Sequence, residues 1–217
     1  MKDKMEKEKY REKEADKIYE EQVGSIYDAY FLWSEEVNKW LEGDIKTNQG
    51  GKENKITGKR LYELAIKELN LHEKEKYEQK SINRFLEKNR EIFGVKDGYF
   101  ISGLLKLTRK KEVPHKKTEF LEITGKKDVI DGFISIPGIK EISALGFLNN
   151  TFLEIRGEAG MLLGRNSYQS IIEVEEAETL GLDTEDTDYF LHKSKGKPFI
   201  MGSGRIWYKK NGEWELY

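Results

Sequence analysis

The sequence contains no cysteine, and this absence removes several chemistries. Disulfide bonds, thiolate nucleophiles and cysteine-based zinc or iron–sulfur sites are all excluded. Histidine is scarce too, because His72, His115 and His192 stand alone, with no second ligand at the spacing of a zinc site. The sequence therefore predicts neither a metal site nor a cofactor, and it is compatible with a reducing compartment.

Long apolar runs are also missing. No stretch approaches the roughly 20 consecutive apolar residues that a membrane-spanning helix needs. The first residues, MKDKMEKEKYREKEADK, lack the apolar core of a secretory signal. From these two absences we expect a soluble, cytoplasmic protein with no membrane partner.

A strong excess of one charge is absent as well. The net charge is −2, so a globally basic nucleic-acid binder is not indicated, although a local basic face is compatible with this balance. Charged residues make up 36% of the chain and hydrophobic residues 37%, which predicts a heavily charged surface over a modest core. The 11 Tyr, 10 Phe and four Trp can fill that core, so a folded chain is expected.

The first half of the chain has helical patterns. Residues 1–22 alternate cationic and anionic side chains, as in a solvated helical arm. Apolar residues then follow at steps of three and four from Val23 to Leu41, which predicts a helix that ends at Gly43. A second helix should begin after Thr57 as its N-cap, with a buried stripe of Leu61, Leu64, Ala65 and Leu69. A third should begin at Ser81 and face inward with Ile82, Phe85, Leu86 and Ile92.

Turn signals and alternating residues predict β-structure further along the chain. Asp97-Gly98 is typical of a hairpin turn, and the following LLKLTRKKEV favours a strand that Pro114 ends. GFISIPGI, TFLEIRG and SIIEVE are expected as strands, the first of them ending in a turn at Pro137-Gly138. RIWYKKNGEWELY predicts a hairpin around Asn211-Gly212, with Trp207 opposite Leu216 and Lys209 opposite Trp214. No internal repeat is visible.

The expected fold class is α+β, with a helical, winged-helix-like N-terminal half and an antiparallel, β-rich C-terminal half. The predicted divisions are a charged helical arm (1–22), a winged-helix-like domain (23–110), a linker (111–128) and a β-rich domain (129–217).

Basic residues gather around the third helix and the predicted hairpin. They are Lys80, Arg84, Lys88, Arg90, Lys106, Arg109, Lys110 and Lys111. In a winged helix, the third helix can enter the major groove while the hairpin contacts phosphate. These eight residues are therefore the candidate nucleic-acid contacts. A solvated face is the other interpretation, because lysine is abundant throughout the chain and Glu87 and Glu91 share the same helix.

The segments SIYDAYFLWSEEVN, ITGKRLYELAIKEL and GYFISGLLKL resemble the winged-helix tail of phage and plasmid primases. The resemblance covers residues 24–108 and lies mainly in core aromatics. The primase and helicase motifs that should precede such a tail are not in the sequence. The resemblance implies a winged helix from a mobile element.

Glu173 and Glu175 are two residues apart, so on a strand they share one face, opposite Ile172 and Val174. With Ser135 upstream, this Glu-x-Glu pair is similar to toxin-type ADP-ribosyltransferases. The resemblance implies that Glu175 stabilises an oxocarbenium-like state. The Ser-Thr-Ser strand and the arginine strand of that family are missing, so the interpretation favoured here is the solvated face of a half-buried strand.

With no complete catalytic constellation, the sequence favours a non-enzymatic binding protein. The expected role is a phage- or plasmid-type regulator or inhibitor that engages nucleic acid, a nucleoprotein or a protein partner. Two alternatives stay open: an ADP-ribosyltransferase-like enzyme that uses Ser135, Glu173 and Glu175, and a structural protein–protein interaction module. The sequence does not set the oligomeric state.

Overall fold

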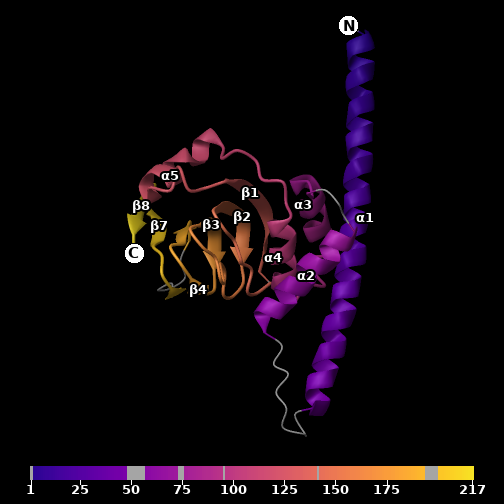
Figure 1. Cartoon of the computed structure of the whole chain (residues 1–217). Coiled ribbons are helices and arrows are strands. Elements are labelled where there is room, and N and C mark those ends of the chain that lie inside the picture. Colours follow the sequence, from indigo (N-terminus) through magenta and orange to yellow (C-terminus); the bar gives the residue numbers. More distant parts are fainter. Residues whose placement is uncertain (1, 48–56, 73–75, 95, 141, 194–199) are drawn as a thin grey trace.

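The computed structural model has helices in the first half and mainly strands in the second (Figure 1). It describes residues 2–47, 57–72, 76–94, 96–140, 142–193 and 200–217. The helices are α1 (Lys2–Thr47), α2 (Gly58–His72), α3 (Gln79–Lys88), α4 (Asp97–Lys106), the 3₁₀ turn η1 (His115–Lys117) and α5 (Thr118–Thr124). The strands are β1 (Gly132–Ile139), β2 (Thr151–Ala159), β3 (Ile171–Ala177), β4 (Leu180–Thr184), β5 (Asp188–Leu191), β6 (Ile200–Gly202), β7 (Ile206–Lys210) and β8 (Glu213–Leu216). Among the described residues, no helix combines the length and the apolar character that crossing a bilayer requires.

The long helix α1 is continuous, and its middle section packs against α2 and α3. The side chains on its packed face are almost fully buried: Val23, Ile26, Ala29, Trp33 and Val37. The indole nitrogen of Trp33 donates a hydrogen bond to the carbonyl oxygen of Leu61 at 3.0 Å. The helix runs past the predicted end at Gly43 to Thr47. The residues predicted as an arm form its first part, and the N-terminal end projects well beyond the rest of the molecule (Figure 1).

The predictions for the next two helices are confirmed in most details. The hydroxyl oxygen of Thr57 accepts a hydrogen bond from the backbone N–H of Arg60 at 3.3 Å, as an N-cap does. The predicted stripe of α2 is buried along its length. In α3, the inward side chains Ile82, Phe85 and Leu86 are fully buried. Ile92 is 63% exposed, because α3 ends at Lys88 and Ile92 lies in the following turn.

The structure does not show the predicted winged helix. Asp97-Gly98 begins α4 instead of turning a hairpin, and the described residues between α3 and β1 contain isolated bridges but no β-hairpin. Asp97 stabilises this start by accepting hydrogen bonds from the Gly94 N–H at 2.6 Å and the Tyr30 hydroxyl at 3.0 Å. Tyr99 to Leu105 are buried on every side, and periodicity alone does not separate such a helix from a buried strand.

The main sheet is parallel, so the prediction of an antiparallel C-terminal half is wrong. Its strand order is β1-β2-β3-β5-β7-β8, and within this sheet only β7 and β8 pair antiparallel. That pair is the predicted hairpin, with Trp207 opposite Leu216 and Lys209 opposite Trp214. Its turn residues Asn211 and Gly212 have φ angles of 53° and 92°, as a type I′ turn needs.

Strands β1, β2, β3, β5 and β7 stack as successive turns of a solenoid-like coil. A second parallel sheet, formed by β4 and β6, belongs to the same coil. Gly132 pairs with Thr151, and Phe152 pairs with Ile171, so the first two turns of the coil have equal length. We call each turn of the coil a rung. The chain therefore has a structural repeat, although none is visible in its sequence.

Side chains alternate between the inside and the outside of the coil. Ile134, Leu153 and Ile172 occupy equivalent positions on neighbouring strands and point into the core, where each is at most 1% exposed. The next position along each strand points outward and places Ser135, Glu154 and Glu173 in one row. We call the side of the sheet that bears this row the outer face.

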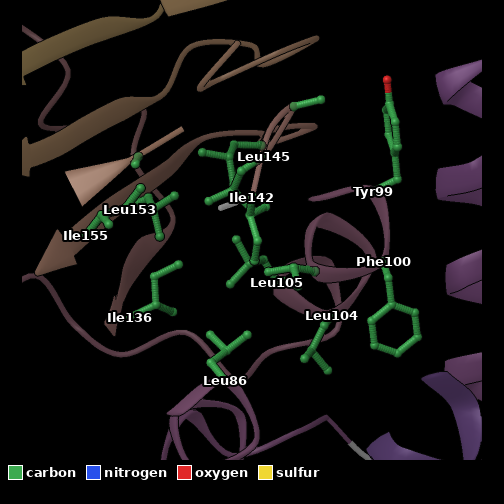
Figure 2. Close-up of a cluster of buried hydrophobic side chains, with 14 of the residues drawn as sticks. Leu86, Tyr99, Phe100, Leu104, Leu105, Ile136, Ile142, Leu145, Leu153 and Ile155 are labelled. Atoms are coloured by element: carbon green, nitrogen blue, oxygen red, sulfur yellow. The ribbon is translucent and has the colours of Figure 1, made fainter. Parts of the chain in front are cut away.

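The helices and the coil share one apolar core, although the sequence predicted two domains at 23–110 and 129–217. Figure 2 shows Leu86 of α3 and Leu105 of α4 in one cluster with Ile136 and Leu153 of the first two strands. The helices therefore cap the β1 end of the coil, while β8 lies at its other end (Figure 1).

Residues 111–128, predicted as a linker, contain η1 and α5, which cover part of the outer face. Phe120 of α5 makes edge-to-face contacts with Phe152 and Phe190, at ring-centroid distances of 5.5 and 4.5 Å. This second apolar cluster leaves the polar row beside it uncovered. The segment just after α5 is fixed by Lys126, which is ion-paired at 2.6 Å with the fully buried Asp188.

Candidate binding groove

The polar row of the outer face is arranged around one lysine. Lys117 of η1 reaches down onto the strands and lies between Glu154 of β2 and Glu173 of β3. Its ammonium nitrogen is 2.9 Å from a carboxylate oxygen of Glu154 and 2.5 Å from one of Glu173. The pairing register forces the two glutamates to be neighbours, and the cation between them offsets their mutual repulsion.

Both glutamates are held at their second oxygen atoms as well. The hydroxyl of Ser135 donates a hydrogen bond to Oε2 of Glu154. Nε2 of His192 lies 2.8 Å from Oε1 of Glu173, and because a carboxylate only accepts, Nε2 is the protonated nitrogen. We call Ser135, Glu154, Lys117, Glu173 and His192 the polar network. Glu173 is only 4% exposed, so it is not the solvated strand residue that the sequence favoured.

The network shifts the pKa of two of its members. Burial acts against the charge of Lys117, but hydrogen bonds and charges from Glu173 and Glu154 outweigh it and raise the pKa of the lysine. Burial also acts against the charge of Glu154, but the hydrogen bonds from Ser135 and Lys117 and the charge of Lys117 lower the pKa of this glutamate. Both groups are therefore held in their charged forms.

We expect the contribution of Glu154 to stability to depend on pH. Its folded-state pKa lies below the unfolded value of 4.5, so the contribution is present above 4.5 and is lost as the pH falls through the folded-state pKa. The free energy of unfolding of Glu154→Gln should therefore fall below that of the wild type at pH 7, and the difference should shrink below pH ~4.5.

The measurement for this prediction is urea unfolding of both proteins between about pH 2.5 and pH 7, because the contribution is lost as the pH falls through the lowered folded-state pKa. The control is Glu112→Gln, because Glu112 is exposed. A difference for Glu154→Gln that stays constant over this range would contradict the assigned role of the network.

An open cleft lies on the strands beside the network. It encloses about 480 Å³ and is lined by Lys117, Glu154, Ile155, Arg156, Gly157, Glu173, Glu175 and His192. We call it the strand cleft. Glu175 stands at its rim, partly exposed, and pairs with Lys193 at 3.2 Å. Four members of the network thus contribute a charged, mutually bonded floor to this cleft: Lys117, Glu154, Glu173 and His192.

A second open cleft lies between the helices and the edge of the sheet. It encloses about 750 Å³ and is lined by Asp16, Glu20, Gln79, Lys80, Asn83, Arg84, Glu87, Lys111 and Arg156. We call it the helix cleft. Arg156 lines both clefts, so they adjoin at this residue and together form what we call the groove.

Two cations of the groove have no ion-pair partner among the described residues. They are Arg156, which follows Ile155 on β2, and Lys111, which precedes η1, and both side chains are exposed. The other lining cations are engaged: Lys117 with two glutamates, and Lys80 and Arg84 with carboxylates of α1. The groove therefore presents free positive charge near the junction of its two parts.

Most of the basic residues predicted to contact nucleic acid are paired within the chain. Lys80 pairs with Asp16 at 2.9 Å, and Arg84 and Lys88 both pair with Glu20. Further pairs join Arg109 to Glu78 at 2.7 Å and Lys110 to Asp131 at 3.9 Å. Arg90, Lys106 and Lys111 are exposed. The structure thus does not gather the eight residues into one free basic face, because α1 brings acidic side chains onto α3.

The residues of the alternative enzyme hypothesis all lie on the outer face. Ser135 and Glu173 occupy one row, but Glu154 stands between them and Glu175 is in the next row. Sequence analysis missed Lys117, Glu154, Arg156 and His192. The equal rungs carried a signal, because residues at equivalent positions of neighbouring strands are polar in an otherwise apolar pattern.

Compared with protein-family models, curated proteins and solved structures, the chain gives no significant match. The resemblances to primase tails and to ADP-ribosyltransferases therefore stay predictions. Within the described part of the chain, no three His, Asp or Glu side chains are placed to hold a metal ion together. The groove is the feature from which a function can be inferred.

Proposed function

We propose that the protein is a non-enzymatic binding protein whose partner is another protein, held in the groove. The observation that carries this proposal is the position of Arg156. It is an exposed cation without a partner among the described residues, and it lies where the strand cleft and the helix cleft adjoin. An arginine left unpaired beside a preorganised floor is typical of a recognition residue.

The paired state of the basic residues favours a protein partner over nucleic acid. Affinity for nucleic acid depends on cations that are free to neutralise phosphates. Lys80, Arg84 and Lys88 already neutralise carboxylates of α1, so their charge attracts a polyanion weakly. Glutamates also line both parts of the groove and repel phosphates.

The polar network supports the groove in this proposal, and its members do not act as catalysts. Ser135 donates its hydroxyl hydrogen to Glu154, and both glutamates are ion-paired with Lys117. Such mutual pairing holds charged side chains in fixed positions at the floor of a binding site. A partner then meets a rigid surface and loses less free energy through ordering of side chains.

Reversing the charge of Arg156 is expected to weaken partner binding strongly. Hydrogen bonds to charged groups contribute about 1.5–3 kcal/mol, so Arg156→Glu should weaken binding by at least about tenfold. The measurement is capture of partner protein by the immobilised full chain from a nuclease-treated lysate of its source cells. Arg90→Glu is the matched control, because Arg90 is exposed and lies outside the groove.

The proposal requires that capture by the wild type and by Arg90→Glu survives nuclease treatment, while capture by Arg156→Glu is lost. Capture that disappears with nuclease would show that nucleic acid is the partner. Equal capture by the wild type and Arg156→Glu would show that the groove is not the binding site.

A further inference from the structure

We propose that the groove binds a peptide segment of the partner, with an Asp or Glu carboxylate of that segment on Arg156. This inference rests on the proposed function and specifies the chemistry of the bound segment. The two open clefts share Arg156 in their linings, so a segment bound at this residue is placed next to both of them.

The free cations set the charge of the occupant. Of the cations that line the groove, Arg156 and Lys111 have no ion-pair partner among the described residues. The planar guanidinium of an arginine matches a carboxylate with two parallel hydrogen bonds, whereas a lysine acts as a point charge. Arg156 is therefore the specific contact, and Lys111 adds attraction on the helix side.

The lining glutamates argue for a peptide and against a continuous polyanion. A nucleic acid carries one charge per nucleotide, so its phosphates would also face Glu175 on one side of Arg156 and Glu87 on the other. A peptide can place an acidic residue at Arg156 and neutral or basic residues beside these glutamates. Glu87 is exposed, lines the helix cleft and has no partner among the described residues, so it favours a hydrogen-bond donor or a cation in the segment.

The polar network makes Arg156 the preferred contact for an acidic residue in the strand cleft. Lys117 already has both of its glutamates within 3 Å, and burial restricts its access to a further anion. His192 is likewise engaged through Nε2 by Glu173. A carboxylate that enters this cleft therefore finds its free cationic donor group at Arg156.

The test is selection of a display library of random nonapeptides on the full-length wild type, on Arg156→Gln and on Arg90→Gln. We expect peptides enriched on the wild type and on Arg90→Gln to carry Asp or Glu several times more often than the starting library. The enrichment should vanish on Arg156→Gln. Circular dichroism of the three proteins checks that all of them are folded.

Three outcomes would overturn the inference: selection without acidic bias, the same acidic bias on Arg156→Gln, or no enrichment at all. Competition with oligothymidylate gives a further check. If oligothymidylate displaces the bound selected peptides at a lower concentration than free copies of the same peptides do, the inference is overturned in favour of nucleic acid. If capture from the lysate depends on Arg156 while selection shows no acidic bias, the proposed function stands and only this inference fails.

Discussion

Replacing Asp188 with Asn is expected to lower the free energy of unfolding by about 3–5 kcal/mol, because it removes one partner of a buried ion pair. Asp188 is fully buried and accepts hydrogen bonds from Lys126 at 2.6 Å and from Arg205 at 2.7 and 2.8 Å. Asparagine keeps the shape of the side chain but removes the buried negative charge that both cations share, and among the described residues it leaves Lys126 only the half-exposed Asp186 as an ion-pair partner. Lys126 follows α5 and Arg205 precedes β7, so these ion pairs hold the end of α5 against the strands. Losing them should weaken the packing of α5 on the outer face.

The measurement is chemical unfolding monitored by circular dichroism, with Asp186→Asn as the matched control. Asp186 pairs with the same Lys126 at 3.0 Å, but its side chain is 52% exposed. Exposed ion pairs contribute little, so the control should lose less than about 1 kcal/mol. Equal losses in the two variants would contradict the assignment of the buried pair.

Replacing Gly98 with Ala is expected to destabilise the protein by at least about 2 kcal/mol, because it overpacks a closed contact. A β-carbon at Gly98 would lie within 3 Å of the backbone of Ser143, in the segment that leads from β1 to β2, and a backbone atom cannot move aside as a flexible side chain can. Gly98 lies in α4, so the contact joins the helices to the coil. The substitution therefore tests whether the two parts share one core.

Gly24→Ala provides a control with the opposite sign. Gly24 lies within α1, and a β-carbon there would meet no atom within 4 Å. Alanine in a helix interior is favoured over glycine by about 0.5–1 kcal/mol, so this variant should be slightly more stable than the wild type. Thermal unfolding of both variants measures the two effects. A Gly98→Ala protein as stable as the wild type would contradict the close approach of α4 to the coil.

Local signals in the sequence were sufficient for much of the secondary structure. The cap at Thr57, the stripe of α2 and the turn at Asn211-Gly212 depend on neighbouring residues, and the structure confirms all three. The direction of strand pairing depends on segments far apart in the chain. Buried and exposed residues alternate in the same way along an antiparallel sheet with one solvent-exposed face and along a parallel coil with one outer face. The alternation in the sequence therefore did not distinguish the two architectures.

The candidate site was less predictable than the fold. The sequence placed Glu173 and Glu175 on one strand face, which is correct, and predicted that this face is solvated. Glu175 is exposed, whereas Glu173 is buried because Lys117 of η1 and His192 close over it. These contacts join residues from separate rungs and from a segment predicted as a linker, and no local pattern in the sequence indicates them.

Site-specific photo-crosslinking tests the central claim, that the groove binds a protein, most directly. A benzoylphenylalanine replaces Glu175 at the rim of the strand cleft or, as a control, the exposed Leu71 at the end of α2. In source-cell lysate, the account predicts a crosslinked protein from position 175 that disappears with Arg156→Gln, and none from position 71. A crosslink to nucleic acid, or crosslinks of equal yield from both positions, would contradict it.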